Sequence, residues 1–300
     1  MHIGEKIKEL RISKCITQSQ LAGNFITRNM LSRIENGVAL PSIPTILYIA
    51  EKLKVSPGYL LAQENEEYIY KKIYNMDNIK RAFSDGDFRI CRDICRSIGY
   101  ADDELNLILS RCDVGIAKEE FFFGRLRSSV RFFEEALEYD ERTVYSRGIN
   151  RAEAAVYLRY MRRLSPTLMY DDEITDEKIV KEMAFNDSMC EYMLALERIE
   201  KDEFVSADDA IAIYHIDPKS PLALHLKSKC ELRSKNFYEA KKLLNQILNL
   251  QERIADPVLY SVFFDLEICS REVGDFKDAY EYSVDKVNLL ERMLAEVDPV

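Results

Sequence analysis

Hydrophobic and polar positions alternate with a helical period along almost the whole chain. Apolar residues recur three and four positions apart, as they do on one face of an α-helix, and no convincing strand-like alternation follows Leu61. Glycine and proline are sparse, with 10 and 8 among 300 residues. The pattern therefore predicts an all-α fold. Within it we expect a small five-helix domain followed by an α-solenoid of helical hairpins.

Residues 17–37 predict two short helices with a turn between them. Thr17 and Gln20 form the pattern of a capping box, so the first helix begins at Gln18 and buries Leu21 and Ala22. Thr27 can cap the second helix, which turns Leu31 and Ile34 inward, and Gly37 stands where a helix C-cap belongs.

The outer face of the second helix is polar and suited to DNA. It carries Arg28, Asn29, Ser32, Arg33 and Asn36. Arginine and asparagine side chains can each make two hydrogen bonds to a base edge in the major groove.

These residues carry a resemblance to the helix-turn-helix of the Xre, Cro and phage-repressor family, which extends over residues 3–62. The run Ser32-Arg33-Ile34-Glu35-Asn36-Gly37 is similar to the end of that family's recognition helix, and Pro41-Ser42 to the loop after it. Residues 46–55 and 56–61 resemble its fourth and fifth helices. The link between Leu21 and the recognition helix is shorter than the usual family pattern.

The resemblance implies roles for individual residues. Arg28, Asn29 and Arg33 fall where the family reads bases, and Gln18 and Asn36 fall where it contacts phosphates. The expected DNA-binding set is Gln18, Thr27, Arg28, Asn29, Ser32, Arg33 and Asn36. The expected partner is double-stranded DNA.

Charge is divided unevenly between the two halves of the chain. The formal net charge is −10, which by itself argues against nucleic acid. Residues 1–62 nevertheless hold eight lysines and arginines against four glutamates, a net +4, which leaves −14 for the remainder. A basic head on an acidic body favours docking on DNA through the head alone.

The cysteines and the N-terminus indicate a cytoplasmic protein. The seven cysteines are an odd number, and none of their spacings fits a zinc site, so no metal or other cofactor is expected. Cys91 and Cys95 lie four apart on a predicted helix, which suits core packing better than redox chemistry. Residues 1–15 form a charged helix rather than a signal peptide, and no apolar run is long enough to cross a membrane.

A recurring block marks the rest of the chain as a repeat array. In each copy a large apolar residue is followed three positions later by a small one, which predicts a close contact between two helices. The large residues are Phe88, Leu126, Phe204, Phe237 and Phe276. Their separations of 38, 78, 33 and 39 residues correspond to a unit somewhat longer than 34 residues, with one copy missing.

This period resembles the tetratricopeptide repeat, a helical hairpin whose apolar face only a neighbouring hairpin covers. Laid on that pattern, the first helix of each hairpin faces an inner groove that suits an extended peptide. The expected ligand-binding residues are Arg111, Lys118, Asn150, Asn186, Tyr192, His225, Lys229 and Arg271.

No catalytic set stands out in the sequence, so an enzyme is not expected. The chain has three histidines and no glycine-rich phosphate loop. The acidic runs Asp102-Asp103-Glu104 and Asp171-Asp172-Glu173 fall where linkers or helix N-termini are expected, and acidic residues suit the helix dipole there.

The two halves together resemble the RRNPP-type regulators of Gram-positive bacteria, cytoplasmic receptors for short imported peptides. The expected organisation is a DNA-binding domain at 1–62, a linker at 63–70, and a ligand-binding and dimerisation domain at 71–300. The resemblance implies a homodimeric transcription regulator of the quorum-sensing kind. A constitutive phage-type repressor without a ligand and a protein-interaction scaffold remain open.

Overall fold

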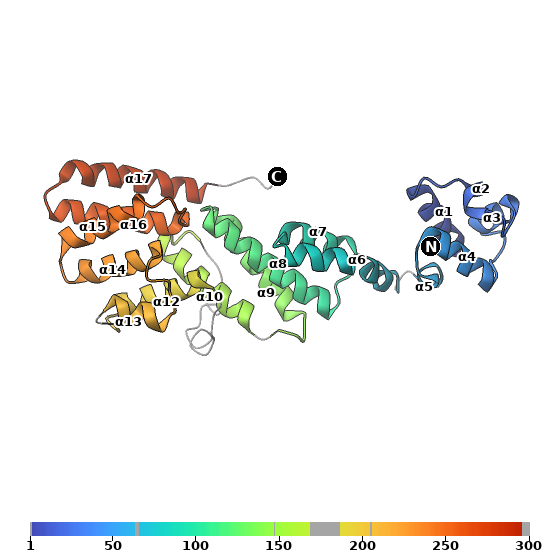
Figure 1. Cartoon of the computed structure of the whole chain (residues 1–300), viewed down its shortest axis with the longest axis horizontal. Helices are drawn as coiled ribbons and strands as arrows, with labels where there is room; N and C mark the ends of the chain where they lie inside the picture. Colours follow the sequence, from blue (N-terminus) through green and yellow to red (C-terminus); the bar gives the residue numbers. More distant parts are fainter. Residues whose placement is uncertain (1, 64–65, 147, 169–186, 205, 296–300) are drawn as a thin grey trace. The chain divides into compact units, whose positions relative to one another are not determined.

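The computed structural model describes residues 2–63, 66–146, 148–168, 187–204 and 206–295. Within these residues all regular secondary structure is helical, which confirms the predicted all-α class (Figure 1). The chain divides into two compact units, one formed by residues 1–85 and 93–101, the other by residues 86–92 and 102–300.

The first unit begins with the predicted five-helix head. Its helices are α1 (Ile3–Ser13), α2 (Gln18–Ala22), α3 (Arg28–Glu35), α4 (Ile43–Leu53) and α5 (Pro57–Leu61). Thr17 caps α2 with the predicted capping box, and the hydroxyl of Thr27 caps α3 by accepting a hydrogen bond from the backbone N–H of Met30 at 3.1 Å. The caps satisfy backbone donors that would otherwise be orphaned, so both helices begin where the sequence predicts.

The core of the head consists of aliphatic side chains that meet between the five helices. The four positions predicted to face inward, Leu21, Ala22, Leu31 and Ile34, are all buried. Ile7, Ile46, Ile49 and Leu53 complete the core from α1 and α4.

The short link between α2 and α3 is held by aromatic packing. The ring of Phe25 stacks on that of Tyr48 with 4.6 Å between centroids. Gly23 has φ +52°, and a Cβ atom there would lie 2.3 Å from the hydroxyl of Tyr48. Only glycine permits both this backbone conformation and this approach.

The segment expected as a linker is partly helical. Helix α6 (Glu67–Ser84) begins inside the predicted linker 63–70. Lys6 lies fully buried beneath this start, where its ammonium group donates to the carbonyl of Ala62 at 2.5 Å and pairs with Glu67 at 2.8 Å. The compact unit therefore continues through α6, beyond the boundary at residue 62.

The helices after α6 are α7 (Phe88–Ser97), α8 (Asp103–Phe122), α9 (Leu126–Glu141), α10 (Ile149–Leu164), α12 (Ser188–Glu200), α13 (Ala207–Ile213), α14 (Pro221–Arg233), α15 (Phe237–Leu248), α16 (Asp256–Glu272) and α17 (Phe276–Leu294). Among them, sequential pairs form between α8 and α9, α12 and α13, α14 and α15, and α16 and α17. The division between the two units passes through α7. Asp102 caps α8, as expected for that acidic run, whereas Asp171-Asp172-Glu173 lies outside the described residues.

The recurring block marks the second helix of a hairpin. Phe88, Leu126, Phe237 and Phe276 are each the first residue of such a helix. Phe204 differs, because Ser206 caps α13 and the helix begins only at Ala207. The small residues three positions after the large ones are all buried: Cys91, Ser129, Ala207, Ala240 and Ala279. Both Cys91 and Cys95 are buried thiols, as the packing interpretation requires.

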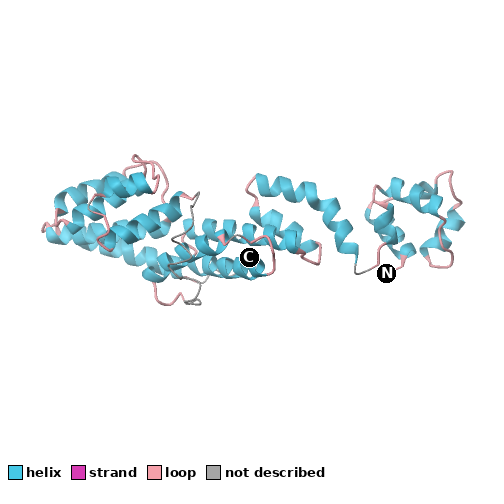
Figure 2. Cartoon of the chain, turned by 90° about the horizontal axis from the view of Figure 1, so that it is seen from below, coloured by secondary structure: helices cyan, strands magenta, loops and turns pink. Residues whose placement is uncertain are grey.

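Within the second unit the array of hairpins returns onto itself. Helix α16 packs against α8, and α17 packs against α9 (Figures 1 and 2). The guanidinium of Arg127 donates to the carbonyl of Leu294 at 3.0 Å, and the hydroxyl of Tyr160 donates to the carbonyl of Pro257 at 3.3 Å. One large core therefore runs from α8 to α17.

Candidate nucleic-acid interface and ligand site

The recognition face of the head is exposed, and no counter-charge from the described part of the chain lies on it. Arg28, Asn29, Arg33 and Asn36 are exposed on α3 or at its C-cap, and Ser32 between them is half-buried. Neither Arg28 nor Arg33 forms an ion pair with any residue that the structure describes. This face is therefore free to donate hydrogen bonds to a partner outside the chain.

Buried charge holds that face in place. Glu35, on the inner side of α3, accepts hydrogen bonds from Arg11 at 2.6 and 3.0 Å. It also accepts one from the side-chain amide of Gln18 at 2.8 Å. The carboxylate raises the pKa of Arg11, although burial of the guanidinium opposes the effect. Gln18, expected at a phosphate, thus ties α2 to α3 through one of its two N–H groups, and Thr27 is the cap of α3.

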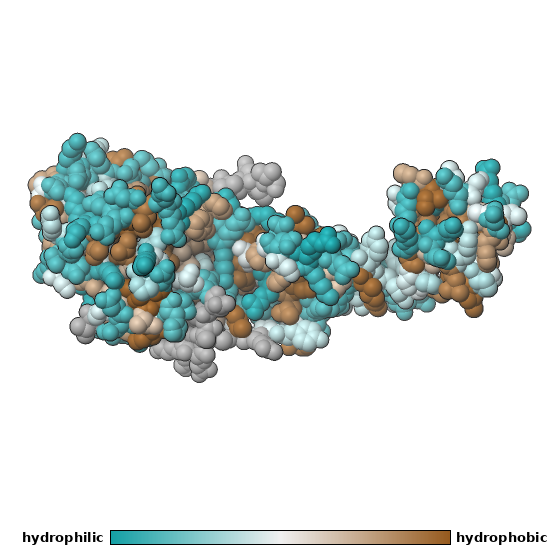
Figure 3. Space-filling view, viewed as in Figure 1, coloured by the Kyte–Doolittle hydropathy of each residue, from teal (hydrophilic) through white to brown (hydrophobic). Residues whose placement is uncertain are grey.

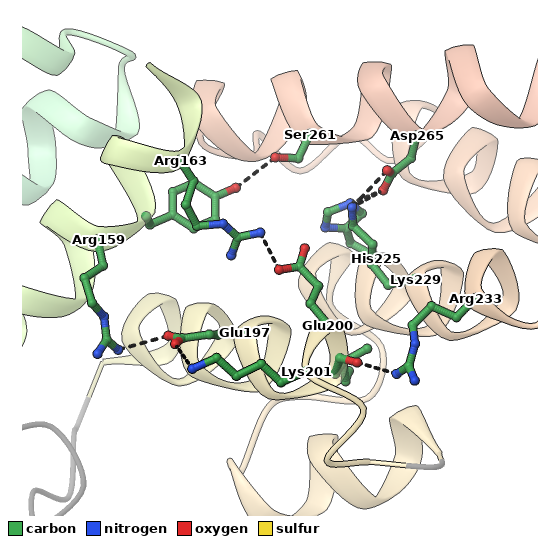
Figure 4. A network of polar contacts seen from close by, with 12 residues as sticks. Arg159, Arg163, Glu197, Glu200, Lys201, His225, Lys229, Arg233, Ser261 and Asp265 are labelled. Carbon is green, nitrogen blue, oxygen red and sulfur yellow. Dashed lines mark hydrogen bonds and ion pairs between the residues drawn. The ribbon is translucent and has the colours of Figure 1, made fainter. Parts of the chain in front are cut away.

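In the array, polar side chains on the first helices of the hairpins form hydrogen bonds and ion pairs with one another. Figure 4 shows a network that runs from α10 through α12 and α14 to α16. Arg159 donates to Glu197 at 3.0 Å, and Lys201 donates to the same carboxylate at 2.8 Å. Arg163 pairs with Glu200, and Tyr160 shares a hydrogen bond with Ser261 at 3.0 Å.

The deepest part of the network is a chain of three buried residues, Tyr192, His225 and Asp265, that ends at the partly exposed Lys229. Tyr192 and His225 are joined through the phenol oxygen and Nδ1 at 2.6 Å. Nε2 of His225 lies 3.0 Å from Asp265, and Lys229 donates to Asp265 at 2.9 Å. A carboxylate only accepts, so Nε2 carries the proton and Nδ1 accepts from the tyrosine hydroxyl.

Burial and charge set the protonation of this chain of residues. Desolvation lowers the pKa of His225 despite the neighbouring carboxylate, so the imidazole is neutral near pH 7. Burial acts to raise the pKa of Asp265, but the charge of Lys229 and the bonds from His225 outweigh it and the pKa is lowered. Burial raises the pKa of Tyr160 to about 12.

The residues predicted to line a groove are divided between several places. Tyr192 and His225 are completely buried, so the expectation that they present side chains to a ligand does not fit their position. The inward faces of α12 and α14 pack against the core at these residues, and the period alone does not distinguish a lining face from a packed one. Asn186 lies outside the described residues.

The predicted cations are used mainly inside the chain. Lys118 pairs with Glu153 at 2.6 Å and with Asp187 at 2.7 Å, and Lys229 pairs with Asp265. Burial acts to lower the pKa of Lys118, but the carboxylates of Asp187 and Glu153 outweigh it, and the pKa is raised. Arg271 forms an exposed pair with Glu267 one turn earlier on α16, at 2.7 Å.

Arg111 and Asn150, in contrast, share the wall of one pocket. This pocket of about 620 Å³ lies between α8, the end of α9 and the start of α10. Asn150 is buried, and its amide donates to Ser110 at 2.7 Å and to Asp140 at 3.0 Å. The structure thus brings together two of the eight predicted residues at a cavity.

A second pocket was not predicted. It measures about 490 Å³ and is lined by Val156, Arg159, Tyr160, Arg162, Arg163, Met193, Glu197, Glu200 and Lys201. The signal for it lay in the spacing, because arginines on α10 and glutamates on α12 recur three and four positions apart on single helical faces. Four cations and two carboxylates make its lining positive.

The comparisons with known proteins agree with the geometry of the head. Residues 4–66 match a family model described as a helix-turn-helix domain. The head is a helix-turn-helix domain. The helix-turn-helix inferred from the recognition helix is confirmed for these residues. No curated protein sequence matches the chain.

Several solved structures are similar over nearly the whole length. PlcR of Bacillus thuringiensis, in complex with the peptide PapR7 and DNA, is 14% identical, with 98% of this chain and 99% of that chain covered at a TM-score of 0.28. ComR from S. thermophilus, in complex with DNA and its signalling peptide ComS, is 18% identical, with 96% and 99% covered at 0.27. The pheromone receptor Rgg2 of Streptococcus dysgalactiae is 13% identical, with 96% and 99% covered at 0.22.

A metal centre is absent from the described part of the chain. No group of three or more histidine, cysteine, aspartate or glutamate residues there is placed to hold a metal ion. Among the same residues, no helix has the length and apolar character needed to span a bilayer.

Proposed function

We propose that this protein is a sequence-specific DNA-binding transcription regulator whose helical array senses a short peptide. The observation that carries the DNA half is the exposed face of α3, where Arg28, Asn29 and Arg33 have no side-chain partner among the residues that the structure describes. A helix-turn-helix places its second helix in the major groove, where such side chains read base edges. Asn36 and Gln18 are assigned to flanking phosphates.

Selection of genomic fragments by the full-length protein tests this half. We expect enrichment of a two-fold symmetric sequence whose half-sites lie about one helical turn apart. Binding that fell uniformly with added salt and showed no sequence preference would instead indicate a charge-driven scaffold.

The peptide half rests on the pocket between α10 and α12. Its volume of about 490 Å³ falls within the range of about 300–1,000 Å³ that is usual for ligand sites. The charged lining offers donors to carboxylates and acceptors to amides, and Tyr160 and Met193 add apolar contact area. A short peptide with a free or side-chain carboxylate fits this chemistry. The pocket at Arg111 and Asn150 extends the set of candidate contacts along the first helices of the hairpins.

Calorimetry with peptides encoded beside the gene tests the peptide half. Arg163→Gln should weaken binding because it removes a cation from the pocket, whereas Arg142→Gln, an exposed arginine on the end of α9, should not. If no such peptide bound the wild-type protein, the constitutive-repressor alternative would be favoured.

A homodimer is the form that we propose, with the contact on α17. One face of this helix exposes Phe276, Tyr280, Val284 and Val287, at 71, 72, 39 and 47% of their surface. Their spacing of four, four and three residues forms a continuous apolar stripe. Figure 3 shows hydrophobic residues in separate patches among hydrophilic ones on the visible face.

Light scattering on full-length variants separates this contact from one through the head. Tyr280→Glu should yield a monomer at micromolar concentration, because the charge would be buried in the contact. Ile43→Glu, which places the same charge on an exposed apolar residue of the head, should leave the dimer intact. The reverse result would move the dimer contact to the head.

A further inference from the structure

The first unit contains a pocket that neither DNA reading nor the array uses. It measures about 460 Å³ and lies between the ends of α1 and α4, helix α5 and the first half of α6. Its lining is mainly apolar and aromatic. The residues are Leu10, Ser13, Lys14, Lys54, Val55, Ser56, Tyr59, Tyr70, Lys71, Ile73, Tyr74 and Asn75.

Close packing fixes the floor of this pocket. Tyr70 of α6 lies against α5 at Gly58, where a Cβ atom would come within 2.4 Å of the phenol oxygen. The rings of Tyr59 and Tyr70 meet edge to face, with 6.2 Å between centroids. The buried Lys6–Glu67 ion pair anchors the start of α6 beside them. These contacts join the head to α6 within one compact unit.

The rim carries positive charge without compensation. Lys14, Lys54 and Lys71 line the pocket, and the lining contains no aspartate or glutamate. None of the three lysines forms an ion pair within the ranges that the structure describes. Three like charges around an apolar cavity focus a positive potential into it, which attracts an anion.

The apolar wall is left open to solvent. Ile73 and Tyr74 expose 67% of their surface each on α6, and both border the cavity. Covering such side chains removes apolar surface from water, which favours a ligand with an apolar body. A purely ionic ligand would leave the apolar wall exposed to water. An uncharged ligand would form no ionic contact with the three ammonium groups.

We propose that this pocket binds an amphipathic anion, a small molecule with one negatively charged head group and an apolar body. The head group lies among Lys14, Lys54 and Lys71, and the body packs on Tyr59, Tyr70 and Ile73. An ammonium group is a point charge without the fixed fork of arginine, so a carboxylate and a sulfate serve equally as head groups. The ligand contacts the head and α6 together and therefore stabilises their junction.

Calorimetry on the full-length protein with three probes tests this site. The probes are octanoate, octyl sulfate and 1-octanol, which share an eight-carbon chain and differ in the head group. Both anions should bind at least about tenfold more tightly than the alcohol, a ratio that corresponds to roughly 1.4 kcal/mol of binding free energy. Octanoate and octyl sulfate should bind with similar affinity, because three ammonium groups do not select between a carboxylate and a sulfate.

Three variants place the binding at this pocket. Ile73→Glu adds a negative charge to an exposed position and should abolish binding of both anions. Lys71→Gln should weaken it several-fold, whereas Lys80→Gln, an exposed lysine on α6 outside the lining, should leave it unchanged. Circular dichroism of each variant verifies the fold. Equal affinity for octanol and the anions, or unchanged anion binding by Ile73→Glu, would overturn the proposal.

Discussion

The recognition face of α3 and the inner faces of the array carry similar residues but use them differently. Arg28 and Arg33 of the head are exposed and have no carboxylate partner among the described residues. Arg159, Arg163 and Lys118 of the array are each paired with a glutamate or aspartate from another helix. The polar face of α3 is thus unpaired within the described residues, whereas the array pairs its charges with one another, including those of the pocket that we propose for the peptide.

The counter-charges within the array come from positions far apart in the sequence. Lys118 finds Glu153 and Asp187 on later elements, and His225 finds Asp265 forty positions further along the chain. The three-to-four-residue period shows which residues share a face, but it does not show which faces meet. For this reason the helical period predicted the structure of the compact head better than it predicted the contacts within the array.

The largest effect expected is on the stability of the array. Asp265→Ala removes the shared partner of the buried His225 and the partly exposed Lys229, and loss of one partner of a buried pair costs up to about 3–5 kcal/mol. Urea unfolding followed by circular dichroism should show the array transition at lower denaturant and the head transition unchanged.

An exposed ion pair provides the matched control. Asp275, 56% exposed, pairs with Lys241 at 2.7 Å, and Asp275→Ala should change the free energy of unfolding by about 1 kcal/mol at most. If the two variants lost equal stability, the buried chain of residues would not be the brace that its geometry implies.

The next effect concerns DNA affinity: Arg33→Ala leaves stability unchanged, whereas Gln18→Ala also removes a hydrogen bond to the buried carboxylate of Glu35. Arg33→Ala should cost about 1–3 kcal/mol of binding on the selected site and relax the preference at one base pair. Gln18→Ala should weaken all sequences alike, because phosphate contacts position the protein without reading sequence. Fluorescence anisotropy with selected and scrambled duplexes measures both, with Lys8→Ala on α1 as a control away from the recognition face.

The assignment of the recognition face would be wrong if Arg33→Ala bound the selected site as tightly as the wild type does. In that case the exposed face of α3 would not be the surface that reads the DNA sequence.

The smallest effect expected is a pH dependence of the array. The folded pKa of His225 lies below its ordinary value of 6.5, because burial disfavours the imidazolium. As the pH falls through 6.5 the unfolded chain takes up a proton that the folded chain excludes, so stability declines toward the folded pKa. Asp265 adds nothing in this range, since its pKa lies below 3.8.

Thermal melts at pH 7.5 and 5.5 measure this contribution. His225→Gln keeps a donor and an acceptor between Tyr192 and Asp265 but removes the titration. Its midpoint should therefore shift less between the two pH values than that of the wild type. An equal shift in both proteins would assign the pH dependence to other groups.

Much of the fold followed from local pattern. The capping box at Thr17, the inward positions of α2 and α3, and the first residue of four second helices all lie where the sequence predicts them. Each depends on residues within one or two turns. The departure at Phe204 has an equally local cause, a serine cap that delays the helix.

The candidate sites were less predictable for a physical reason. Tyr192 and His225 are amphipathic side chains that occur at surfaces and in cores alike. Their burial depends on Asp265, which arrives from α16 with the hydrogen bond that makes burial possible. Likewise the pocket beside Lys71 exists only because α6 packs against α5, and no period in the sequence encodes that contact.

The return of α16 and α17 onto α8 and α9 fixes the number of hairpins. An open solenoid gains or loses a repeat by lengthening or shortening at little cost, because each repeat touches only its neighbours. Here an inserted hairpin would separate Arg127 from Leu294 and Tyr160 from Pro257, which join distant ends of the array. Repeat proteins ordinarily change by duplication and deletion of repeats, and here either change would break these contacts. Sequence diversity should therefore arise by substitutions at a constant number of hairpins.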